Sequence, residues 1–170
     1  TEFYSPRKKK EPGLENSNLY VGSRAPWKNF EMGEKIAQTR KVTAVARRGS
    51  EKNIKFIPDA IESQMPSIYS SAHALLAPSY HEGFGYAAAE SMSCGTPAIF
   101  AQTGFGPEIA REIPEMIVGN PDDYDAMMRA VQAVDDNRKE LSAKSRSYIL
   151  KHNSLKDWQK KWLALAEEIV

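Results

Sequence analysis

The sequence predicts a doubly wound α/β domain: a Rossmann-like, mostly parallel six-stranded sheet with helices on both faces. Two observations predict it. Short runs that are apolar throughout alternate with stretches of helical periodicity, as in a parallel sheet whose strands are covered on both sides. The chain has 170 residues, of which 41% are apolar and 26% charged. This length and composition suit one globular domain with a core of its own.

Six short apolar runs are the expected strands. Apart from Thr43 and Lys55, every residue of these runs is apolar, whereas a half-exposed strand alternates regularly between apolar and polar residues. The fourth run, Ala74–Ala77, is too apolar to have a face in water. In order, the expected strands are Leu19–Val21, Val42–Ala46, Ile54–Ile57, Ala74–Ala77, Ala98–Ala101 and Met116–Val118.

Helical patterns lie between these strands. The first expected helix covers Phe30–Gln38, and the second covers Gln64–Ala72, where apolar residues recur at spacings of three and four. The third covers Tyr86–Cys94, because Gly95 suits the left-handed position that ends a helix and Pro97 cannot continue one. Helices therefore alternate with strands, and a loop leads from the end of a strand into the helix that follows.

Two more helices are expected near the end of the chain. Pro121 can open a helix at its first turn, with Asp122 and Asp123 near the positive end of the helix dipole. The last helix is expected to begin at Ser154, with Asp157 three residues later as a variant of the capping box. Its apolar stripe consists of Leu155, Trp158, Trp162, Leu165 and Ile169.

Composition narrows the classes of function. The formal net charge of +1 argues against nucleic acid as a main partner, because no large basic excess exists to neutralise phosphates. The basic run Arg7–Lys10 is interpreted as part of a solvated linker. Cys94 is the single cysteine, which excludes an internal disulfide and fits a reducing cytoplasm. Its small neighbours indicate a buried residue. No apolar run approaches the ~20 residues that span a bilayer.

The loop between the fourth strand and the third helix carries the candidate chemistry. Ligands of such sheets bind beyond the carboxyl ends of the strands. Gly83 and Gly85 let the backbone approach a ligand, and the helix that follows offers free N–H groups to an anion. Glu82 stands before the glycines and Glu90 lies inside the helix, so the two carboxylates flank the anion site. Ionised carboxylates only accept hydrogen bonds, so each suits hydroxyl groups. A nucleotide sugar has a diphosphate between two such polyols.

The loop after the first strand, Gly22–Lys28, carries two cations, Arg24 and Lys28. Taken alone, either residue is best interpreted as a surface charge. Loops that follow neighbouring strands converge, however, so both cations can face the same diphosphate. Because the glutamate-bearing turn lies nearby, we interpret Arg24 and Lys28 as diphosphate-binding residues rather than as surface charges.

At these residues the chain resembles a known family. The stretch Ala74–Pro97, ALLAPSYHEGFGYAAAESMSCGTP, resembles the E-x7-E signature of the GT-B retaining glycosyltransferases of family 4, the glycosyl transferases group 1. Tyr20–Phe30, YVGSRAPWKNF, is similar to the opening of their C-terminal, donor-binding domain. The initial TEFYSP resembles their interdomain linker, and GFGPEI at 104–109 resembles the loop after the next strand.

The resemblance implies a set of site residues. Glu82 is the catalytic candidate: it would contact donor-sugar hydroxyls, position the sugar and stabilise the cationic transition state. Glu90 would bind the ribose hydroxyls, and Lys28 falls on the phosphate-binding lysine. Arg24 is a further phosphate-binding candidate that stands one place after the position, here Ser23, where many members have arginine. The backbone of the turn would meet the sugar and diphosphate at Gly83, Phe84 and Gly85.

The resemblance also implies an organisation and a reaction. Residues 1–17 would be an interdomain linker, 18–150 the nucleotide-sugar-binding domain, and 151–170 a C-terminal helix that crosses to an N-terminal GT-B domain. That domain, fused or on a separate chain, would carry the acceptor site. The donor would be a UDP-, GDP- or ADP-hexose, and the sugar would be transferred with retention and without a metal or cofactor. The expected location is cytoplasmic, with at most peripheral contact at the inner membrane face.

Several alternatives remain at this stage. The first is a non-catalytic sugar-nucleotide-binding module, or one half of a split transferase. The second is an oxidoreductase, because Gly83–Ala88 fits the dinucleotide pattern G-x-G-x-x-A, although no acidic residue follows at the usual distance. Trp158 and Trp162 can pack either on an N-terminal domain or on this domain's own sheet. His81 is interpreted as an exposed or turn-supporting residue rather than a general base.

Overall fold

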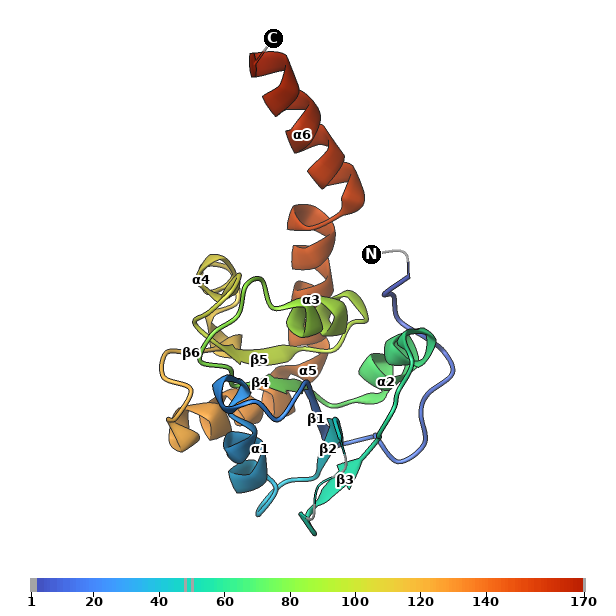
Figure 1. Ribbon diagram of the computed structural model, residues 1–170, viewed down its shortest axis with the longest axis vertical. Helices are drawn as coiled ribbons and strands as arrows, with labels where there is room; N and C mark the ends of the chain where they lie inside the picture. The colour runs from blue at the N-terminus through green and yellow to red at the C-terminus, as the bar shows by residue number, and fades with distance from the viewer. Residues whose placement is uncertain (1–2, 48, 50, 170) are drawn as a thin grey trace.

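The computed structural model describes residues 3–47, 49 and 51–169, and it contains a six-stranded sheet (Figure 1). The strand order is β3-β2-β1-β4-β5-β6, and the five pairings among the described residues are all parallel. The predicted fold class is therefore confirmed, and each expected strand is present within two residues at either end. The strands are β1 Asn18–Val21, β2 Val42–Val45, β3 Ile54–Phe56, β4 Leu75–Ala77, β5 Ala98–Ala101 and β6 Ile117–Val118.

Helices cover both faces of this sheet. The connection from β1 to β2 runs across the sheet in the opposite direction to that from β4 to β5. Because such connections are right-handed, their helices α1 and α3 lie on opposite faces. The four-residue α4 was not predicted, because it is too short to show a periodic pattern. The helices are α1 Phe30–Ile36, α2 Met65–Ser71, α3 Tyr86–Ser93, α4 Gly106–Ile109, α5 Tyr124–His152 and α6 Leu155–Ile169.

The core lies between the sheet and these helices. All four residues of β5 are buried, and Leu19 and Leu75 of the neighbouring strands are fully buried. Cys94 is only 3% exposed, which confirms its interpretation as a buried residue. Burial raises the pKa of the Cys94 thiol to about 11, so the nucleophilic thiolate is scarce at neutral pH.

Helix α5 begins at Tyr124, so the prediction that Pro121 opens it was wrong. The Asp123 carboxylate accepts a hydrogen bond from the amide of Ala126 at 2.8 Å, which makes Asp123 the N-cap. The three residues before it form a turn instead, in which the side chain of Asn120 accepts from the amide of Asp122 at 3.0 Å. Asparagine and aspartate side chains favour such turns and caps over helical interior positions.

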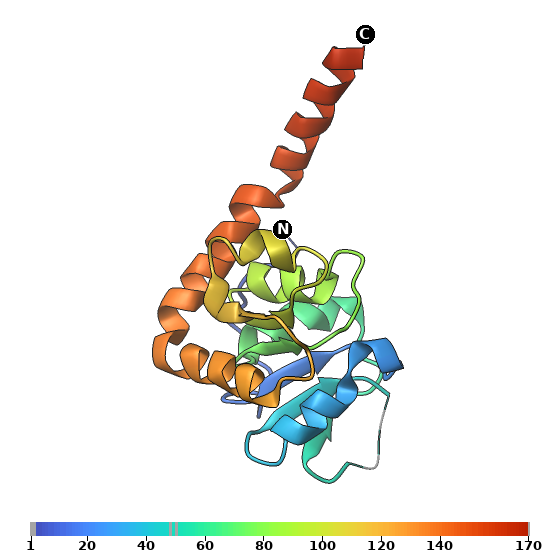
Figure 2. The ribbon, with the colours of Figure 1, turned by 90° about the vertical axis from the view of Figure 1, so that its left-hand side faces the viewer.

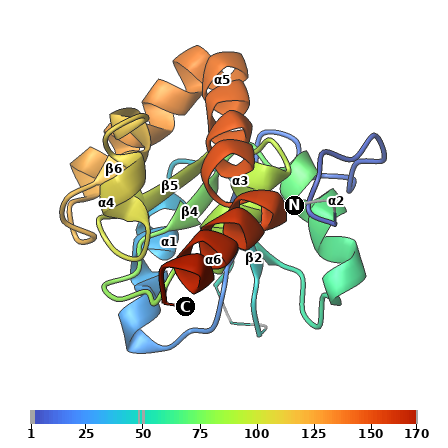
Figure 3. The same ribbon diagram turned by 90° about the horizontal axis from the view of Figure 1, so that it is seen from above.

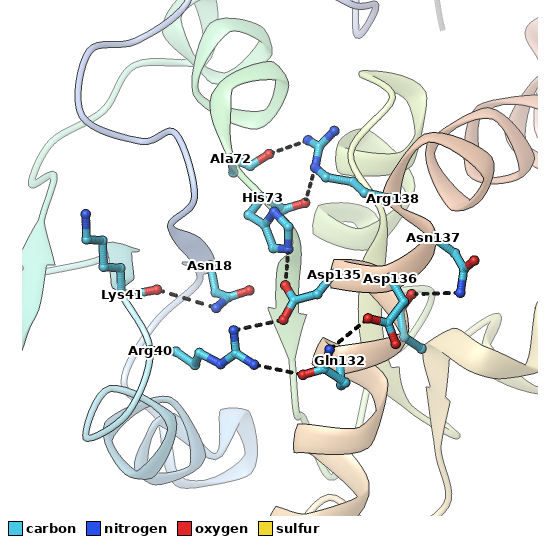
Figure 4. A network of polar contacts seen from close by, with 11 residues as sticks. Asn18, Arg40, Lys41, Ala72, His73, Gln132, Asp135, Asp136, Asn137 and Arg138 are labelled. Carbon is cyan, nitrogen blue, oxygen red and sulfur yellow. Dashed lines mark hydrogen bonds and ion pairs between the residues drawn. The ribbon is translucent and has the colours of Figure 1, made fainter.

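Helix α5 runs past the amino edge of the sheet, and it kinks at Asn137, whose φ of −130° is not helical. At this edge Asp135 accepts from His73 Nε2 at 2.7 Å and pairs with Arg40 at 2.8 Å (Figure 4). After the kink, the second half of α5 packs along α3 toward the opposite edge (Figure 2). The kink therefore brings the end of α5 next to the glycine-rich turn.

Residues 3–17 run alongside α2 without helix or strand (Figure 3). The amide of Arg7 donates to Ser70 Oγ at 3.0 Å, and that of Glu11 donates to Ser71 Oγ at 2.6 Å. Leu14 is fully buried and anchors the segment to the core. Thr1 and Glu2, the first residues of the expected linker, lie outside the described residues, and the interdomain role of the segment stays a prediction.

Helix α6 projects away from the sheet (Figures 1 and 2). Its start agrees with the prediction, because Ser154 Oγ accepts from the amide of Asp157 at 3.1 Å. Trp158 and Trp162 are 57% and 55% exposed, so the alternative in which they pack on this domain's own sheet is wrong. The side chain of Ile169 lies outside the described part of the chain.

Candidate functional site

Two loops meet at the carboxyl edge of the sheet, where β1 and β4 are neighbours. The chain moves outward from this point in both directions, so β1 and β4 form the topological switch point at which open α/β sheets bind ligands. A backbone hydrogen bond joins the loops directly, since the amide of Tyr80 donates to the carbonyl of Trp27 at 2.8 Å. The sequence predicted both loops but not this contact.

The loop after β1 presents Lys28 to the loop after β4. A short 3-10 turn, Pro26–Lys28, ends at Asn29 in the left-handed conformation. The ammonium Nζ of Lys28 lies 2.7 Å from Oε1 of Glu82. Their side chains are 26% and 21% exposed, so water reaches the pair but does not surround it.

Glu82 receives a second hydrogen bond from its own loop. The hydroxyl of Ser79, which is buried, donates to the same Oε1 atom at 2.7 Å. Burial and the neighbouring Glu82 carboxylate, in that order, raise the pKa of Tyr20. The Tyr20 hydroxyl stays protonated and donates to the carbonyl of Ser23 at 2.8 Å. Glu82 is thus held in one orientation, with its other oxygen free of hydrogen bonds among the described residues.

The glycine turn leads into the N-terminus of α3. Gly85 has φ of +99°, in the left-handed region that favours glycine. The amides of Ala88 and Ala89 donate to the Gly85 carbonyl at 3.0 and 3.1 Å. Within the described chain the amides of Tyr86 and Ala87 have no such partner, as expected for the first N–H groups of a helix. Anion binding at this end of the helix stays a prediction.

Phe84 fixes the turn against the next loop. Its ring stacks on Phe105 with centroids 5.0 Å apart, and its carbonyl accepts from the Phe105 amide at 3.0 Å. Phe105 in turn faces Tyr148 of α5 at 6.4 Å. This aromatic column connects the turn to the C-terminal half of α5. Sequence reasoning missed Phe105 and Tyr148, because only the tertiary fold brings α5 to this edge.

Glu90 lies in a separate, adjoining cavity. It lines a space of about 530 Å³ together with Tyr4, Phe84, Tyr86 and Trp158. Its Oε2 accepts from the Tyr69 hydroxyl at 2.9 Å. Burial raises the pKa of Glu90, and hydrogen bonds from the tyrosines partly oppose that rise. The Tyr69 hydroxyl was missed because its place in the apolar stripe of α2 predicts only a core residue.

The two glutamates therefore do not share one cavity. Glu82 lines a much smaller space of about 20 Å³ with Lys28, Ser79 and Gly85. The backbone of the turn lies between the two spaces, and Gly83 and Phe84 line a third, of about 460 Å³. A shared anion site between the two carboxylates stays a prediction.

Arg24 does not join Lys28 and Glu82. Its guanidinium pairs with Glu51, lies 3.8 Å from Glu34 and stands over the Phe30 ring at 4.5 Å from the centroid. Its described contacts include none with Lys28 or Glu82. The Glu51 carboxylate pairs with the guanidinium and so holds Arg24 away from Lys28 and Glu82. The assignment of Arg24 to a phosphate stays a prediction.

Three further observations bear on the chemistry. His81 is exposed, as its interpretation required. Within residues 3–47, 49 and 51–169, no group of three or more histidine, cysteine, aspartate or glutamate side chains could hold a metal ion. In the same residues, no helix combines the length and the apolar character needed to cross a membrane.

Comparison with known proteins places the chain in a family. A family model described as glycosyl transferases group 1 matches residues 24–152. A D-inositol 3-phosphate glycosyltransferase from Streptomyces bingchenggensis is 38% identical over 82 residues, which cover 46% of this chain and 18% of that protein. O-antigen chain mannosyltransferase B from Escherichia coli is 30% identical over 98 residues, which cover 56% of this chain and 24% of that protein.

Solved structures agree on the fold. Sucrose-phosphate synthase from Thermosynechococcus elongatus matches 99% of this chain with a TM-score of 0.82 and 21% identity, over 50% of its own length. The C-terminal domain of LpcC, a glycosyl transferase group 1 family protein from Francisella tularensis, matches 91% of this chain with a TM-score of 0.75 and 14% identity, over 97% of its own.

The fold of this chain is that of a GT-B domain of the C-terminal type. The chain belongs to the glycosyl transferases group 1 family, whose model covers more than half of it. The matched segments are less than a quarter of the length of the two curated relatives.

Proposed function

We propose that this chain is the donor-binding domain of a retaining family 4 glycosyltransferase and binds a nucleotide-diphosphate sugar. The observation that carries the proposal is the position of Lys28, held by Glu82 at 2.7 Å where the loops after β1 and β4 meet. A diphosphate at this point would meet the Lys28 ammonium and the free amides at the start of α3 together. Both favour negative charge.

The carboxylates on either side of the turn would hold the two ends of the donor. Glu82 accepts hydrogen bonds from donor-sugar hydroxyls, and Ser79, which donates to it at 2.7 Å, keeps it oriented. Glu90 accepts from the ribose hydroxyls in the cavity beside Phe84. Glu82 and Glu90 are the glutamates of the E-x7-E pattern, and the backbone of Gly83, Phe84 and Gly85 spans the distance between them.

Catalysis in this arrangement is electrostatic. Departure of the nucleoside diphosphate leaves negative charge on the phosphates, which Lys28 and the start of α3 stabilise. When the diphosphate pairs with Lys28, Glu82 loses its cationic partner. Its negative charge then faces the sugar, where positive charge develops at the anomeric carbon. One well-placed contact of this kind is typically worth about 3–4 kcal/mol of the barrier.

The acceptor site belongs to an N-terminal GT-B domain, fused to residues 1–17 or carried by a separate chain. The exposed apolar stripe of α6, with Trp158 and Trp162 more than half exposed, suits packing against that domain. The matched relatives transfer sugars to inositol 3-phosphate or to an O-antigen chain, as their names state. We therefore expect a hexose donor, a glycoconjugate or polysaccharide acceptor, and reaction on the cytoplasmic side.

A second candidate function is a sugar-nucleotide-binding module without turnover, or one half of a split transferase. It is favoured by the exposure of the α6 stripe, which leaves a large apolar surface on this chain. Both candidate functions use the same donor site, and they differ only in whether the sugar is transferred to an acceptor. An assay of sugar transfer by the isolated chain, and then with an added N-terminal domain, distinguishes them.

The donor site itself is tested by thermal shift with UDP-, GDP- and ADP-sugars. We expect one nucleotide class to raise the melting temperature, and Glu90→Ala to abolish that rise. An unchanged rise in the variant would remove the ribose assignment. NAD is included as a control, because stabilisation by NAD alone would revive the oxidoreductase alternative.

A further inference from the structure

A further cavity lies at the opposite end of α3 from the glycine turn. It has a volume of about 550 Å³ and is bounded by the N-terminal segment, the C-terminal ends of α2 and α3, and the second half of α5. Four cations line it, and the lining residues, all of them described, include no carboxylate. The cations are Lys10, Arg138, Lys139 and Arg146.

Neutral backbone carbonyls hold three of these cations in place. Arg138 donates to the carbonyls of Ala72 and His73 at 2.8 and 3.1 Å (Figure 4). Arg146 donates to the carbonyl of Ser93, and Lys10 to that of Ser70. A carbonyl carries no formal charge, so these bonds fix the positions of the cations without neutralising them.

Capping of helix ends accounts for part of this charge. The carbonyls belong to the last turns of α2 and α3 or to the residues just after α2, and each helix C-terminus is equivalent to about −0.5 of a charge. Two helices thus supply about −1 against four cations. The overall net charge is only +1, so the cavity concentrates positive charge that the rest of the surface balances.

Lys139 and Lys144 of α5 differ in whether a described carboxylate neutralises their charge. Lys144 pairs with Glu140 at 2.7 Å and does not line the cavity. Lys139 lines it and has neither an ion pair nor a hydrogen bond with any described residue. Capping does not account for the charge of Lys139, because Lys139 donates no hydrogen bond to a carbonyl of a described helix end. The Lys139 ammonium is therefore available to pair with an anion bound in the cavity.

We propose that this cavity binds the phosphate group of an anionic ligand, at a site separate from the donor site. Guanidinium groups and ammonium groups are the usual partners of phosphate oxygens in proteins. A volume of about 550 Å³ is that of a small-molecule site. The phosphate belongs either to a soluble molecule or to the headgroup of an anionic lipid.

Titration of the 15N-labelled chain with inorganic phosphate tests the proposal. Saturable shifts are expected for the amides of Lys139–Ser147, distinct from any at Gly85–Ala87. Lys139→Gln should weaken this binding at least about tenfold, the effect of losing one charged hydrogen bond. Lys144→Gln is the matched control on the same helix and should leave the affinity unchanged.

Vesicles of phosphatidylglycerol, with phosphatidylcholine as the reference, identify the source of the phosphate. Cosedimentation with phosphatidylglycerol that Lys139→Gln weakens and Lys144→Gln does not would support a lipid headgroup. Phosphate binding at Lys139–Ser147 without cosedimentation would support a soluble ligand. The proposal is wrong if phosphate shifts only Gly85–Ala87 or nothing and vesicles are not bound, or if both variants lose the same binding.

Discussion

The ammonium nitrogen of Lys28 lies 2.7 Å from a carboxylate oxygen of Glu82, although 54 positions separate them in the sequence. They meet because β1 and β4 are neighbours in the sheet, so the loops after both strands end at the same point. The Glu82 carboxylate compensates the charge of Lys28 at the sheet edge, and in the proposed function a diphosphate takes its place.

Lys28→Gln should weaken donor binding at least about tenfold, because a charge-assisted hydrogen bond to the diphosphate is lost. The free energy of unfolding should change by less than about 1 kcal/mol, since ion pairs that water can reach contribute little. Isothermal titration with the donor found in the nucleotide screen gives the first value and chemical denaturation the second. Lys35→Gln, at an exposed position of α1, is the control; equal affinities for the two variants would contradict the assignment.

Glu90 should make stability depend on pH. Burial raises its pKa above that of the unfolded chain, so the folded state binds the proton more tightly. This contribution to stability is complete below the unfolded pKa and is lost as pH rises through the folded pKa. As the pH rises above about 4, the wild type should therefore lose stability relative to Glu90→Gln, and the melting temperature of the variant should rise relative to that of the wild type.

Melting curves at several pH values measure this effect. Glu115→Gln changes an exposed glutamate and should follow the wild-type profile. Parallel profiles for the wild type and Glu90→Gln would show that Glu90 is not the group responsible.

Gly85→Ala and Gly33→Ala should have opposite effects. Gly85 has φ of +99°, and an added Cβ would lie 3.4 Å from the Phe105 ring, so alanine should destabilise by about 1–2 kcal/mol. Gly33 lies within α1, and its Cβ would meet nothing within 4 Å, so alanine should stabilise by about 0.5–1 kcal/mol. Chemical denaturation compares the two variants. A stabilising Gly85→Ala would exclude a strained turn.

Replacing Trp158 and Trp162 together by serine should leave the melting temperature of this chain within a few degrees of the wild type. Both side chains are more than half exposed and pack on each other, with ring centroids 5.8 Å apart. The same variant should lose binding to an N-terminal GT-B domain added in trans, measured by sedimentation. If the variant instead unfolded cooperatively at a much lower temperature, the two side chains of α6 would have to pack against this domain.

The sequence determined the class of fold and located the candidate site along the chain. Apolar runs such as Ala98–Ala101 predicted buried parallel strands because strands covered on both faces cannot alternate with polar residues. Glu82, the glycines and Glu90 form a local pattern, so their order relative to the N-terminus of α3 could be predicted without a structure. Element ends were less certain, as Pro121 illustrates, because turn and helix compete there for the same polar groups.

Contacts between distant segments were decided only by the tertiary structure. Whether Arg24 or Lys28 faces Glu82 depends on which side of the loop each side chain leaves, and the carboxylate of Glu51 holds Arg24 away. The approach of Tyr148 to Phe105 depends in the same way on the kink of α5 at Asn137. Periodicity records which face of an element is buried, but the partner of a side chain depends on how the elements cross. That depends on the packing of the whole domain.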